Sequence, residues 1–479
     1  MPLLDLRTFL DRADAIGELK TIHGADPHLE IGAITELTLQ HDGPALLFDR
    51  IPGYAPNYRV ASNVCPTTRR GLLALGMDPD MPQAEAMATF KERWERYKPV
   101  PPRVVDSSPL IENVQTGDDV DLLQFPVPLW HELDGGPYLG SGLAVIHQDP
   151  DTGAVNVGCY RVQLHGRNLT GLFTEPESDG RSIMNKYWAQ GKACPVAISF
   201  GPEPLLFLSA CTRNGAPRGM QEYEYTGYIA GEPVPVIKGN VTGLPISAGS
   251  EIAIEGEIPP PSVEARTEGP FGEWTGYYEH SPTPEPVIHV KALYYRNDPI
   301  LFGCPPLWHK KSYSFDLPLQ SVGMLSRLEK LEIPVRRIVS LVPFGCTVIT
   351  VQQQQPDDVD RLMDALDKMP NPNRLFIIVD DDVNPEDPWD VLWAVGSRFD
   401  PERARTSIIR SRWLLDPLRT IEDRVSRDAL PYKRMFINGC RPFDRLAEFP
   451  PVNVFSAERR QETWNKWSME DWLPPGSRL

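Results

Sequence analysis

The first hundred residues alternate between helical and strand-like spacing of apolar positions. Residues 5–22 carry apolar side chains at the spacing of a helix face: Leu6, Phe9, Leu10, Ala13 and Ile16. Asp5 is a suitable N-cap and Gly17 ends the pattern. The segment LEIGAITELTLQ also has helical spacing, a strand-like run follows from Pro44, and residues 83–97 predict another helix. We therefore expect an N-terminal α/β region over residues 1–118.

From about residue 119 the pattern changes to short apolar runs separated by Gly, Pro and Asn. The runs LAVIHQ and AVNVGCYRVQLH flank the turn DPDTG, which predicts a β-hairpin. Further strand-like runs follow: PVAISF, PLLFLSA, MQEYEYTGY, PVPVI, EIAIEGEI and VIHVKALYYR. One helical segment, SIMNKYWAQG, interrupts them. This spacing predicts a largely antiparallel sheet or barrel over residues 119–305.

The last third of the chain returns to helical spacing. A connecting helix is expected within residues 306–331, and strand-like and helical runs then alternate over 332–450, which predicts a βαβ-type domain. Residues 451–479 predict a helical tail whose tryptophans dock on a neighbouring subunit or domain. The run Asp380, Asp381 and Asp382 is suited to bind metal or, as we favour, to cap the following helix.

Composition and charge exclude several classes of function. The chain has 479 residues, enough for two or three domains, and a formal net charge of −17. This charge disfavours a general nucleic-acid or anionic-membrane surface. The N-terminus lacks the pattern of a signal peptide, and no apolar run approaches the roughly 20 residues of a membrane span, so we expect a cytoplasmic protein. Seven scattered cysteines without a CxxC pair make a zinc site or disulfide framework unexpected.

The stretch TEGPFGEWTGYY is the strongest candidate for chemistry. It places Glu268 and Glu273 around a Gly-Pro-Phe-Gly turn, a spacing that neither a helix nor a strand explains. Two carboxylates on a rigid, apolar-flanked loop suit proton transfer, although solvated loop charges are the commoner outcome. Arg161 lies among apolar residues and needs a carboxylate partner if buried. Either glutamate is a candidate partner, and a purely structural salt bridge is an equal alternative.

Two weaker groupings also contain polar side chains. Glu222 and Asn156, with the side chains near Ser178 and Asp179, would form an all-oxygen site of the kind that Mg²⁺, Mn²⁺ or K⁺ prefers. Trp308 and His309 follow a double proline at the predicted domain junction. A histidine beside an aromatic residue there is suited to contact a phenolic substrate, and a packed or surface histidine is the alternative.

The chain resembles the UbiD family of decarboxylases, which use prenylated FMN. The resemblance extends in the family's order to about residue 416. It is carried by five segments: DLRTFLDRADAIGELK, LEIGAITELTLQHDGPALLF, DPDTGAVNVGCYR, TEGPFGEWTGYY and DDDVNPEDPWDVLWAVGSRFDP. It implies a mixed α/β fold with an N-terminal α/β region, a central split β-barrel that holds the flavin, and a C-terminal α/β domain used for oligomerisation.

The resemblance also implies roles for particular residues. The family's catalytic set falls on Arg161, Glu268 and Glu273, with Arg161 paired to Glu268 and Glu273 as proton donor. Its ligands to Mn²⁺ (or Mg²⁺), often accompanied by K⁺, fall on Asn156 and Glu222. A histidine that serves as third ligand in many members is absent from TGLFTEPESDGRS, so Asp179 is carried over in its place. Further cofactor contacts are expected from four residues: Cys159, Tyr160, Arg161 and Leu172.

The implied reaction is reversible decarboxylation of an aromatic acid through a covalent adduct with prenylated FMN. His309 and Trp308 as substrate-binding residues favour a hydroxybenzoate, similar to protocatechuate or vanillate. Heteroaromatic or acrylic acids are alternative substrates, and a non-catalytic subunit of a larger carboxylase complex is an alternative of another class. The implied partners are the acid, CO₂ and a UbiX-type flavin prenyltransferase that supplies the cofactor. The protein is expected to form a homo-oligomer, either a dimer or a hexamer.

Overall fold

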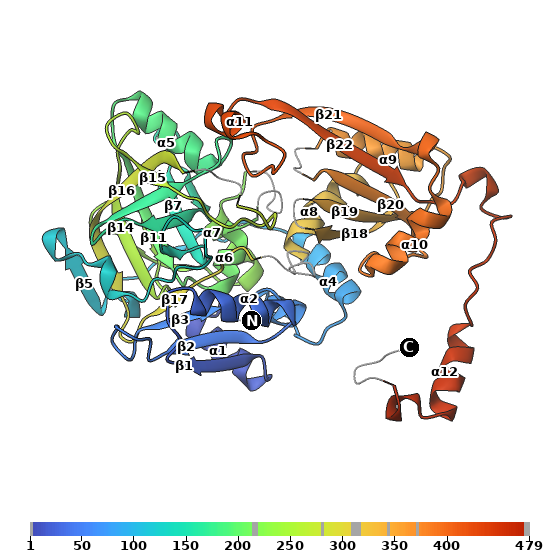
Figure 1. Ribbon diagram of the computed structural model, residues 1–479, viewed down its shortest axis with the longest axis horizontal. Coiled ribbons are helices and arrows are strands. Elements are labelled where there is room, and N and C mark those ends of the chain that lie inside the picture. The colour runs from blue at the N-terminus through green and yellow to red at the C-terminus, as the bar shows by residue number, and fades with distance from the viewer. Residues whose placement is uncertain are drawn as a thin grey trace.

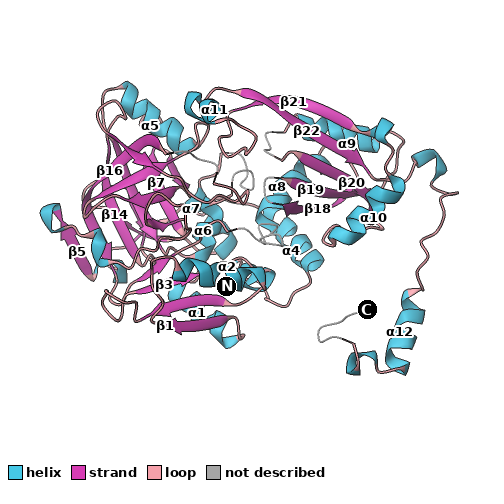
Figure 2. Cartoon of the chain, viewed as in Figure 1, coloured by secondary structure: helices cyan, strands magenta, loops and turns pink. Residues whose placement is uncertain are grey.

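The mixed α/β fold expected from the sequence is confirmed in the computed structural model (Figure 1). The structure describes residues 3–212, 219–278, 282–307, 318–342, 345–369 and 373–473. Figure 2 shows the strands gathered in a large curled sheet on one side and a smaller sheet on the other, with helices packed around both. No helix in the described ranges has the length and apolar character needed to cross a bilayer.

The N-terminal elements form a small sheet covered by helices. Asp5 caps the first helix as predicted, because its side chain accepts a hydrogen bond from the Thr8 backbone N–H at 2.8 Å, and Gly17 adopts a φ of 74° beyond its end. The sheet order is β1-β2-β3-β17, so a strand from residue 300 onward completes it. The elements are α1 (Leu6–Ala15), β1 (Leu19–His23), α2 (Glu30–Gln40), β2 (Ala45–Asp49), β3 (Arg59–Ser62), α3 (Thr68–Ala74), α4 (Gln83–Glu95) and β17 (Ile300–Phe302).

The central sheet has ten strands and curls into a split barrel. Its order is β6-β9-β10-β16-β14-β11-β7-β8, with β5 and β15 also paired to β16. The strands are β5 (Asn113–Thr116), β6 (Tyr138–Gly140), β7 (Leu143–Gln148), β8 (Val155–Gly158), β9 (Arg161–Leu164), β10 (Leu169–Phe173), β11 (Cys194–Phe200), β14 (Ile252–Ile258), β15 (Ala265–Glu268) and β16 (Thr283–Tyr295).

The curl of this sheet follows from one short connection. Only Cys159 and Tyr160 separate β8 from β9, and a link of that length spans at most about 11 Å. In the sheet order, however, these strands are six steps apart, which in a flat sheet is about 29 Å. The sheet must therefore bend until its two ends approach each other.

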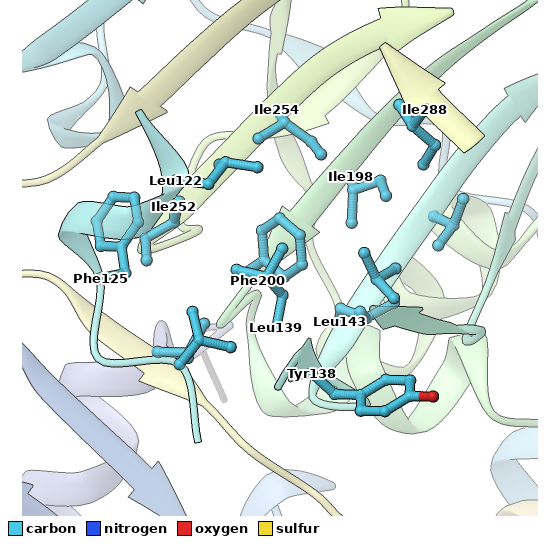
Figure 3. Close-up of a cluster of buried hydrophobic side chains, with 14 of the residues drawn as sticks. Leu122, Phe125, Tyr138, Leu139, Leu143, Ile198, Phe200, Ile252, Ile254 and Ile288 are labelled. Atoms are coloured by element: carbon cyan, nitrogen blue, oxygen red, sulfur yellow. The ribbon is translucent and has the colours of Figure 1, made fainter. Parts of the chain in front are cut away.

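Both faces of the barrel sheet are buried. Along β7, Leu143 and Val145 belong to the interior cluster, whereas Ala144 and Ile146 pack in a second cluster on the other face. Figure 3 shows part of the interior cluster, with Ile198 and other side chains from neighbouring strands directed at one another. This alternation is the period of two that a strand imposes on its side chains. The outer elements are α5 (Asp179–Ala189), α6 (Pro204–Ala210), α7 (Glu222–Ala230) and a small sheet of β4 (Arg103–Val104), β12 (Pro235–Lys238) and β13 (Pro245–Ser247).

Three sequence-based predictions in this region are wrong. The runs PLLFLSA and MQEYEYTGY form helices α6 and α7 rather than strands. Pro204 occupies the first turn of α6, while Gln221 and Glu224 form a capping box at the start of α7. The run AVNVGCYRVQLH is not one strand, because it breaks between β8 and β9 and the two halves pair at opposite ends of the sheet.

The C-terminal elements alternate strand and helix as predicted. Their sheet order is β18-β19-β20-β22-β21, with parallel and antiparallel pairs. The elements are α8 (Pro318–Glu329), β18 (Val335–Val342), β19 (Cys346–Val351), α9 (Asp358–Asp367), β20 (Leu375–Asp380), α10 (Pro388–Arg398), β21 (Arg405–Ser411), α11 (Ile421–Ser426), β22 (Leu430–Asn438) and α12 (Ala457–Lys466). Short 3-10 turns lie at Pro109–Ile111, Gly117–Asp119, Leu122–Gln124, Pro401–Arg403, Phe443–Arg445 and Met469–Asp471.

The predicted capping role of the aspartate run after β20 is also wrong. The N-cap of α10 is Asp387, whose side chain accepts from the Trp389 N–H. Asp380 is buried and Asp382 lies beside it, and both carboxylates pair with Arg398 and Arg441 instead. Buried carboxylates at the end of a central strand need such cations to offset the cost of desolvation.

Helix α12 lies apart from the rest of the chain in Figure 1. Two tryptophans of this tail are largely exposed, Trp467 at 63% and Trp472 at 62%. Large exposed aromatic side chains are typical of surfaces that contact another protein. The docking of this tail on a neighbouring subunit stays a prediction.

Glu251 ties the N-terminal helix to the barrel, which gives a test of the fold. Its side chain is fully buried and accepts two hydrogen bonds from Arg7 at 2.8 Å, one from the Ile300 N–H at 3.1 Å and one from Arg296 at 3.3 Å.

We expect Glu251→Ala to lower the free energy of unfolding by about 3 kcal/mol, because the arginines lose a buried partner. Thermal unfolding followed by circular dichroism measures the effect. Glu257→Ala, an exposed glutamate of β14, is the control, and an equal effect of both changes would contradict the assignment.

Candidate active site

The stretch TEGPFGEWTGYY forms a loop that begins where β15 ends. Glu268 is the last residue of β15 and is fully buried. The chain then passes through a cis Gly269–Pro270 bond, and the Glu273 backbone N–H donates to the Tyr277 carbonyl at 3.0 Å. Glu273 is 6% exposed. The loop therefore carries both glutamates into the interior, and the solvated-charge alternative is excluded.

Arg161 binds both of these glutamates. Its Nε and Nη2 donate to the two carboxylate oxygens of Glu268 at 2.8 and 2.7 Å, a bidentate pair. Its Nη1 donates to Oε1 of Glu273. Arg161 is 6% exposed and opens β9. The sequence left a choice between two partners, and the structure brings both to the guanidinium.

Aromatic side chains surround this ion pair. The Arg161 guanidinium carbon lies 4.1 Å from the ring centroid of Phe173 and 5.3 Å from that of Phe271, which are cation–π distances. The Tyr138 hydroxyl donates to Glu268 Oε1 at 2.8 Å. Burial, together with the charge of Glu268, raises the pKa of Tyr138, so its hydroxyl stays a donor. Glu268 thus accepts three strong hydrogen bonds.

The electrostatics of the cluster favour a proton on Glu273. Burial raises the pKa of Glu273 to about 7; Arg161 opposes this shift, and the nearby charge of Glu175 adds to it. Burial by itself would lower the pKa of Arg161, but Glu268 and Glu273 outweigh it and raise that pKa. One guanidinium therefore binds two carboxyl groups unequally, with two hydrogen bonds to Glu268 and one to Glu273. Glu268 is held by the guanidinium fork, and Glu273 is suited to carry a proton near neutral pH.

The loop is anchored from a second segment of the chain. Asp134 Oδ1 accepts from the Gly272 N–H at 3.1 Å, and its carboxylate also bonds His131 Nδ1 at 2.9 Å. His131 Nε2 donates to the Pro306 carbonyl at 2.6 Å. At Gly135 a Cβ would lie 2.0 Å from the Gly269 carbonyl oxygen, so only glycine allows this approach. These contacts fix the position of the residue next to Glu273.

A second polar cluster lies where β8 ends and α5 begins. The Tyr160 hydroxyl accepts from the Gly180 N–H at 3.2 Å, and the side chain of Asn156 lies near it. Its ring lies close to the backbone of Gly158 and Gly180, where a Cβ would meet ring atoms at 2.7 and 2.9 Å. Glu222 accepts from the Val157 N–H at 2.9 Å, which brings α7 to the same edge. Tyr160 directly precedes Arg161, so the two clusters adjoin.

The donor set of this second cluster suits a hard cation and a phosphate. Burial raises the pKa of Glu222 to about 7, and the charge of Asp179 adds to the shift, so a cation bound here would stabilise the charged form of Glu222. The Asn156 side-chain nitrogen is buried without a hydrogen-bond partner in the described chain. An amide and carboxylates are ligands for Mg²⁺ or Mn²⁺ rather than Zn²⁺. The described residues contain no group of three His, Cys, Asp or Glu side chains arranged around one point.

The remaining predicted site residues have different environments. Cys159 is partly buried, and its thiol donates to the Ser141 carbonyl at 3.0 Å. Leu172 is fully buried in the interior cluster of the barrel. Asp179 opens α5 and is exposed. Trp308 and His309 lie outside the described residues, so their predicted substrate contacts stay predictions.

Sequence reasoning missed several residues that build the site. Glu175 and Phe173 stand in the segment TGLFTEPESDGRS, where no local pattern distinguishes them from solvated or core residues. Tyr138 stands in the glycine-rich segment GPYLGSGLAV, which has no motif that marks the tyrosine. The pair of His131 and Asp134 carries no motif. Their roles depend on strand pairing and burial, which short-range patterns do not encode.

The chain is similar to known proteins in both sequence and fold. Three domains of the 3-octaprenyl-4-hydroxybenzoate carboxy-lyase (UbiD) family match the chain: the N-terminal domain over residues 10–88, the Rift-related domain over 103–307 and the C-terminal domain over 323–420. A curated relative, the phenolic acid decarboxylase of Streptomyces sp. (strain D7), is 32% identical over 418 residues, covering 83% of this chain and 85% of that protein.

Solved structures share the whole fold. Vanillic acid decarboxylase of Sedimentibacter hydroxybenzoicus is 25% identical with a TM-score of 0.81, covering 98% of this chain and 100% of that one. The UbiD-class enzyme HmfF of Pelotomaculum thermopropionicum, in complex with FMN, has the same identity, TM-score and coverage. The fold and these similarities are those of a carboxy-lyase, a decarboxylating enzyme. The chain belongs to the UbiD family.

Proposed function

We propose that this enzyme decarboxylates a hydroxybenzoate, similar to protocatechuate or vanillate, with prenylated FMN as cofactor. The single observation that carries the proposal is the buried arrangement of Arg161 between Glu268 and Glu273. Support for the substrate class comes from relatives named for phenolic and vanillic acids. HmfF is known in complex with FMN, which supports a flavin here. The prenylated form is inferred from the family resemblance of the sequence.

Arg161 and Glu268 are proposed to place the substrate carboxylate. The contacts with the two glutamates use three of the five guanidinium N–H groups, so two can point to an anionic ligand. The bidentate bond to Glu268 and the ring of Phe173 hold the guanidinium in one orientation. A fixed cation beside the reacting carbon contributes orientation without further reorganisation.

Glu273 is proposed as the proton donor. When bound, prenylated FMN supplies an electrophilic centre and an electron sink. As the bond between the ring carbon and the carboxylate breaks, CO₂ leaves, and the electron pair left on that carbon takes the proton from the Glu273 carboxyl. Solvent then returns a proton to Glu273. A carboxyl with a pKa near 7 is well matched to this task at neutral pH.

The second cluster is proposed to hold the cofactor phosphate with its metal. Asn156, Glu222 and Asp179 would bind Mn²⁺ (or Mg²⁺), with K⁺ as a further ion. Tyr160, Cys159 and Leu172 would contact the cofactor from the adjoining strands. The α5 N-terminus lies at this cluster and favours negative charge. Because the cluster adjoins Arg161, a flavin phosphate held there would leave the ring system near the two glutamates.

Several broader expectations belong to the same proposal. His309 and Trp308 would contact the ring hydroxyls of the substrate. We retain residues 119–305 as the cofactor-binding domain and 332–450 as the oligomerisation domain of a homo-oligomer, dimer or hexamer. A UbiX-type flavin prenyltransferase would supply the cofactor in the cytoplasm. Heteroaromatic or acrylic acids are the second candidate substrates, and bicarbonate at high concentration would drive the reverse reaction.

Bound cofactor and substrate choice test the proposal together. Protein produced alongside a flavin prenyltransferase should carry prenylated FMN, seen by absorbance and mass spectrometry, and should contain Mn²⁺ by elemental analysis. We expect it to release CO₂ from protocatechuate or vanillate faster than from pyrrole-2-carboxylate or cinnamate. Faster CO₂ release from pyrrole-2-carboxylate or cinnamate would instead favour heteroaromatic or acrylic acids as the substrate class. Bound flavin without CO₂ release or deuterium exchange for any acid would instead favour a non-catalytic subunit.

The proton-donor assignment is tested by Glu273→Gln. The amide still accepts from Arg161 but supplies no proton, so we expect retained flavin and a loss in turnover of at least about 100-fold. Initial rates of CO₂ release measure the loss, with flavin content as the check on integrity. Glu257→Gln, at an exposed position of β14, is the control and should leave turnover unchanged. Near-normal turnover in Glu273→Gln would remove the proposed role.

The pH dependence of turnover follows from the same group. Glu273 must be protonated to act, and its pKa in the folded protein is about 7, so turnover is expected to be high below pH 7 and to fall as pH rises through this value. A pH profile of kcat measured between pH 5.5 and 9, at saturating acid, tests this. A rise in turnover across the same range would indicate that Glu273 acts as a base.

A further inference from the structure

A segment of the C-terminal part reaches the barrel beside the candidate active site. We call residues 412–428, between β21 and β22, the docking segment; it includes α11, which Figure 1 shows on the side of α5. Trp413 is 7% exposed and Leu414 is fully buried, although both lie in a loop. Such burial requires contact with another part of the molecule. Trp413 contacts the ring of Tyr432 of β22, with 6.0 Å between centroids, whereas the Leu414 backbone contacts the barrel.

Two polar contacts connect the docking segment to the barrel. The Leu414 backbone N–H donates to Oε2 of Glu175 at 3.2 Å, across 239 positions of sequence. At the other end of the segment, Arg427 pairs with Glu285 of β16, which also binds Arg181 at 3.1 Å. Both barrel glutamates are buried, Glu175 at 8% exposure and Glu285 at 1%. The segment is therefore held on the barrel at two defined points.

Glu175 also faces the catalytic cluster. It follows β10 by two residues, and Phe173 at the end of β10 covers the Arg161 guanidinium. The charged groups that face Glu273 come from two strands and a loop: Arg161 of β9, Glu268 of β15 and Glu175 after β10. Glu175 in turn faces Arg181 of α5. Next to Glu268 stand Tyr138 and His165, and burial lowers the pKa of His165.

We propose that Glu175 is a positioning residue that couples docking of residues 412–428 to retention of the proton on Glu273. The inference rests on the proposed role of Glu273 and adds a residue that the catalytic set does not include. A backbone N–H that donates to a carboxylate favours its charged form. Charged Glu175 disfavours a second negative charge on Glu273, because like charges in a buried site repel strongly. While residues 412–428 are docked on the barrel and exclude water from the site, the Glu273 carboxyl therefore keeps its proton.

When the docking segment leaves the barrel, the repulsion between Glu175 and Glu273 and the burial of Glu273 both decrease. Glu175 loses the Leu414 N–H, and water screens its charge from Glu273. The burial that favours a neutral Glu273 also decreases. Glu273 then exchanges its proton with solvent, as it must do once in each catalytic cycle. One residue therefore links the position of the segment to the protonation of the donor.

Glu175→Gln separates the charge of this residue from its hydrogen bond. The amide oxygen still accepts from Leu414, so the segment stays docked, but the repulsion on Glu273 is gone. We expect the alkaline fall in kcat to move to lower pH by about 1 unit. Glu175→Asp keeps the negative charge, so the alkaline fall in kcat should return towards the pH at which the unmodified enzyme shows it. Glu422→Gln, an exposed glutamate of α11 with the same change in charge, is the control and should not move the profile.

Hydrogen exchange of the holoenzyme tests the docking half of the proposal. Glu175→Ala removes the acceptor, so the Leu414 amide should exchange at least about tenfold faster, while Glu175→Gln should keep its protection. Arg427→Gln loosens the other contact and should also speed exchange in the segment. Circular dichroism on the same samples confirms that each variant is folded.

The outcomes distinguish this proposal from the function on which it rests. An unmoved pH profile in folded Glu175→Gln, with Glu273→Gln inactive, overturns the coupling and leaves the proton donor in place. Unchanged exchange at Leu414 in Glu175→Ala overturns the docking contact. Near-normal turnover in Glu273→Gln removes the proposed donor itself, whatever the Glu175 variants do.

Discussion

The structure depends on one buried guanidinium held between two carboxyl groups. Removing Arg161 from water is costly, and that cost is offset only because Glu268 and Glu273 both bind it and aromatic rings cover its face. One cation cannot neutralise two buried anions. The cluster therefore favours a proton on the less strongly bound carboxyl, Glu273, whose pKa burial raises to about 7. A carboxyl group that holds its proton near neutral pH is a direct consequence of this imbalance.

The barrel supplies the geometry that this cluster needs. The two-residue link between β8 and β9 forces the ends of the curled sheet together. It also places Asn156 and Tyr160, at the predicted phosphate and metal site, directly beside Arg161. Asp134, which His131 holds in place, also fixes the loop through its contact with the Gly272 N–H. A short chain connection and a rigid loop thus hold two chemically different clusters at a constant separation.

Local patterns predicted much of the fold because the forces behind them are local. The Asp5 cap and the Gly17 stop mark α1, and the turn DPDTG marks the hairpin of β7 and β8. The same reasoning failed for α6 and α7, since an apolar run of seven to nine residues buried on most sides reads equally well as a strand. It failed again at Cys159, where the chain leaves one end of the sheet for the other. Periodicity carries no information about such a break.

The amino-acid sequence is enough to show that Glu268 and Glu273 lie on one turn-rich loop and to name the side chains suited to acid–base chemistry. Its ordered segments were also sufficient to indicate the family. Only the tertiary structure decided that Arg161, 107 and 112 positions away, binds both glutamates. The same holds for Glu175, which meets Leu414 across 239 positions. The reason is physical: charge interactions and burial act through space, and the distances that govern them are set by strand pairing and barrel closure rather than by separation along the chain.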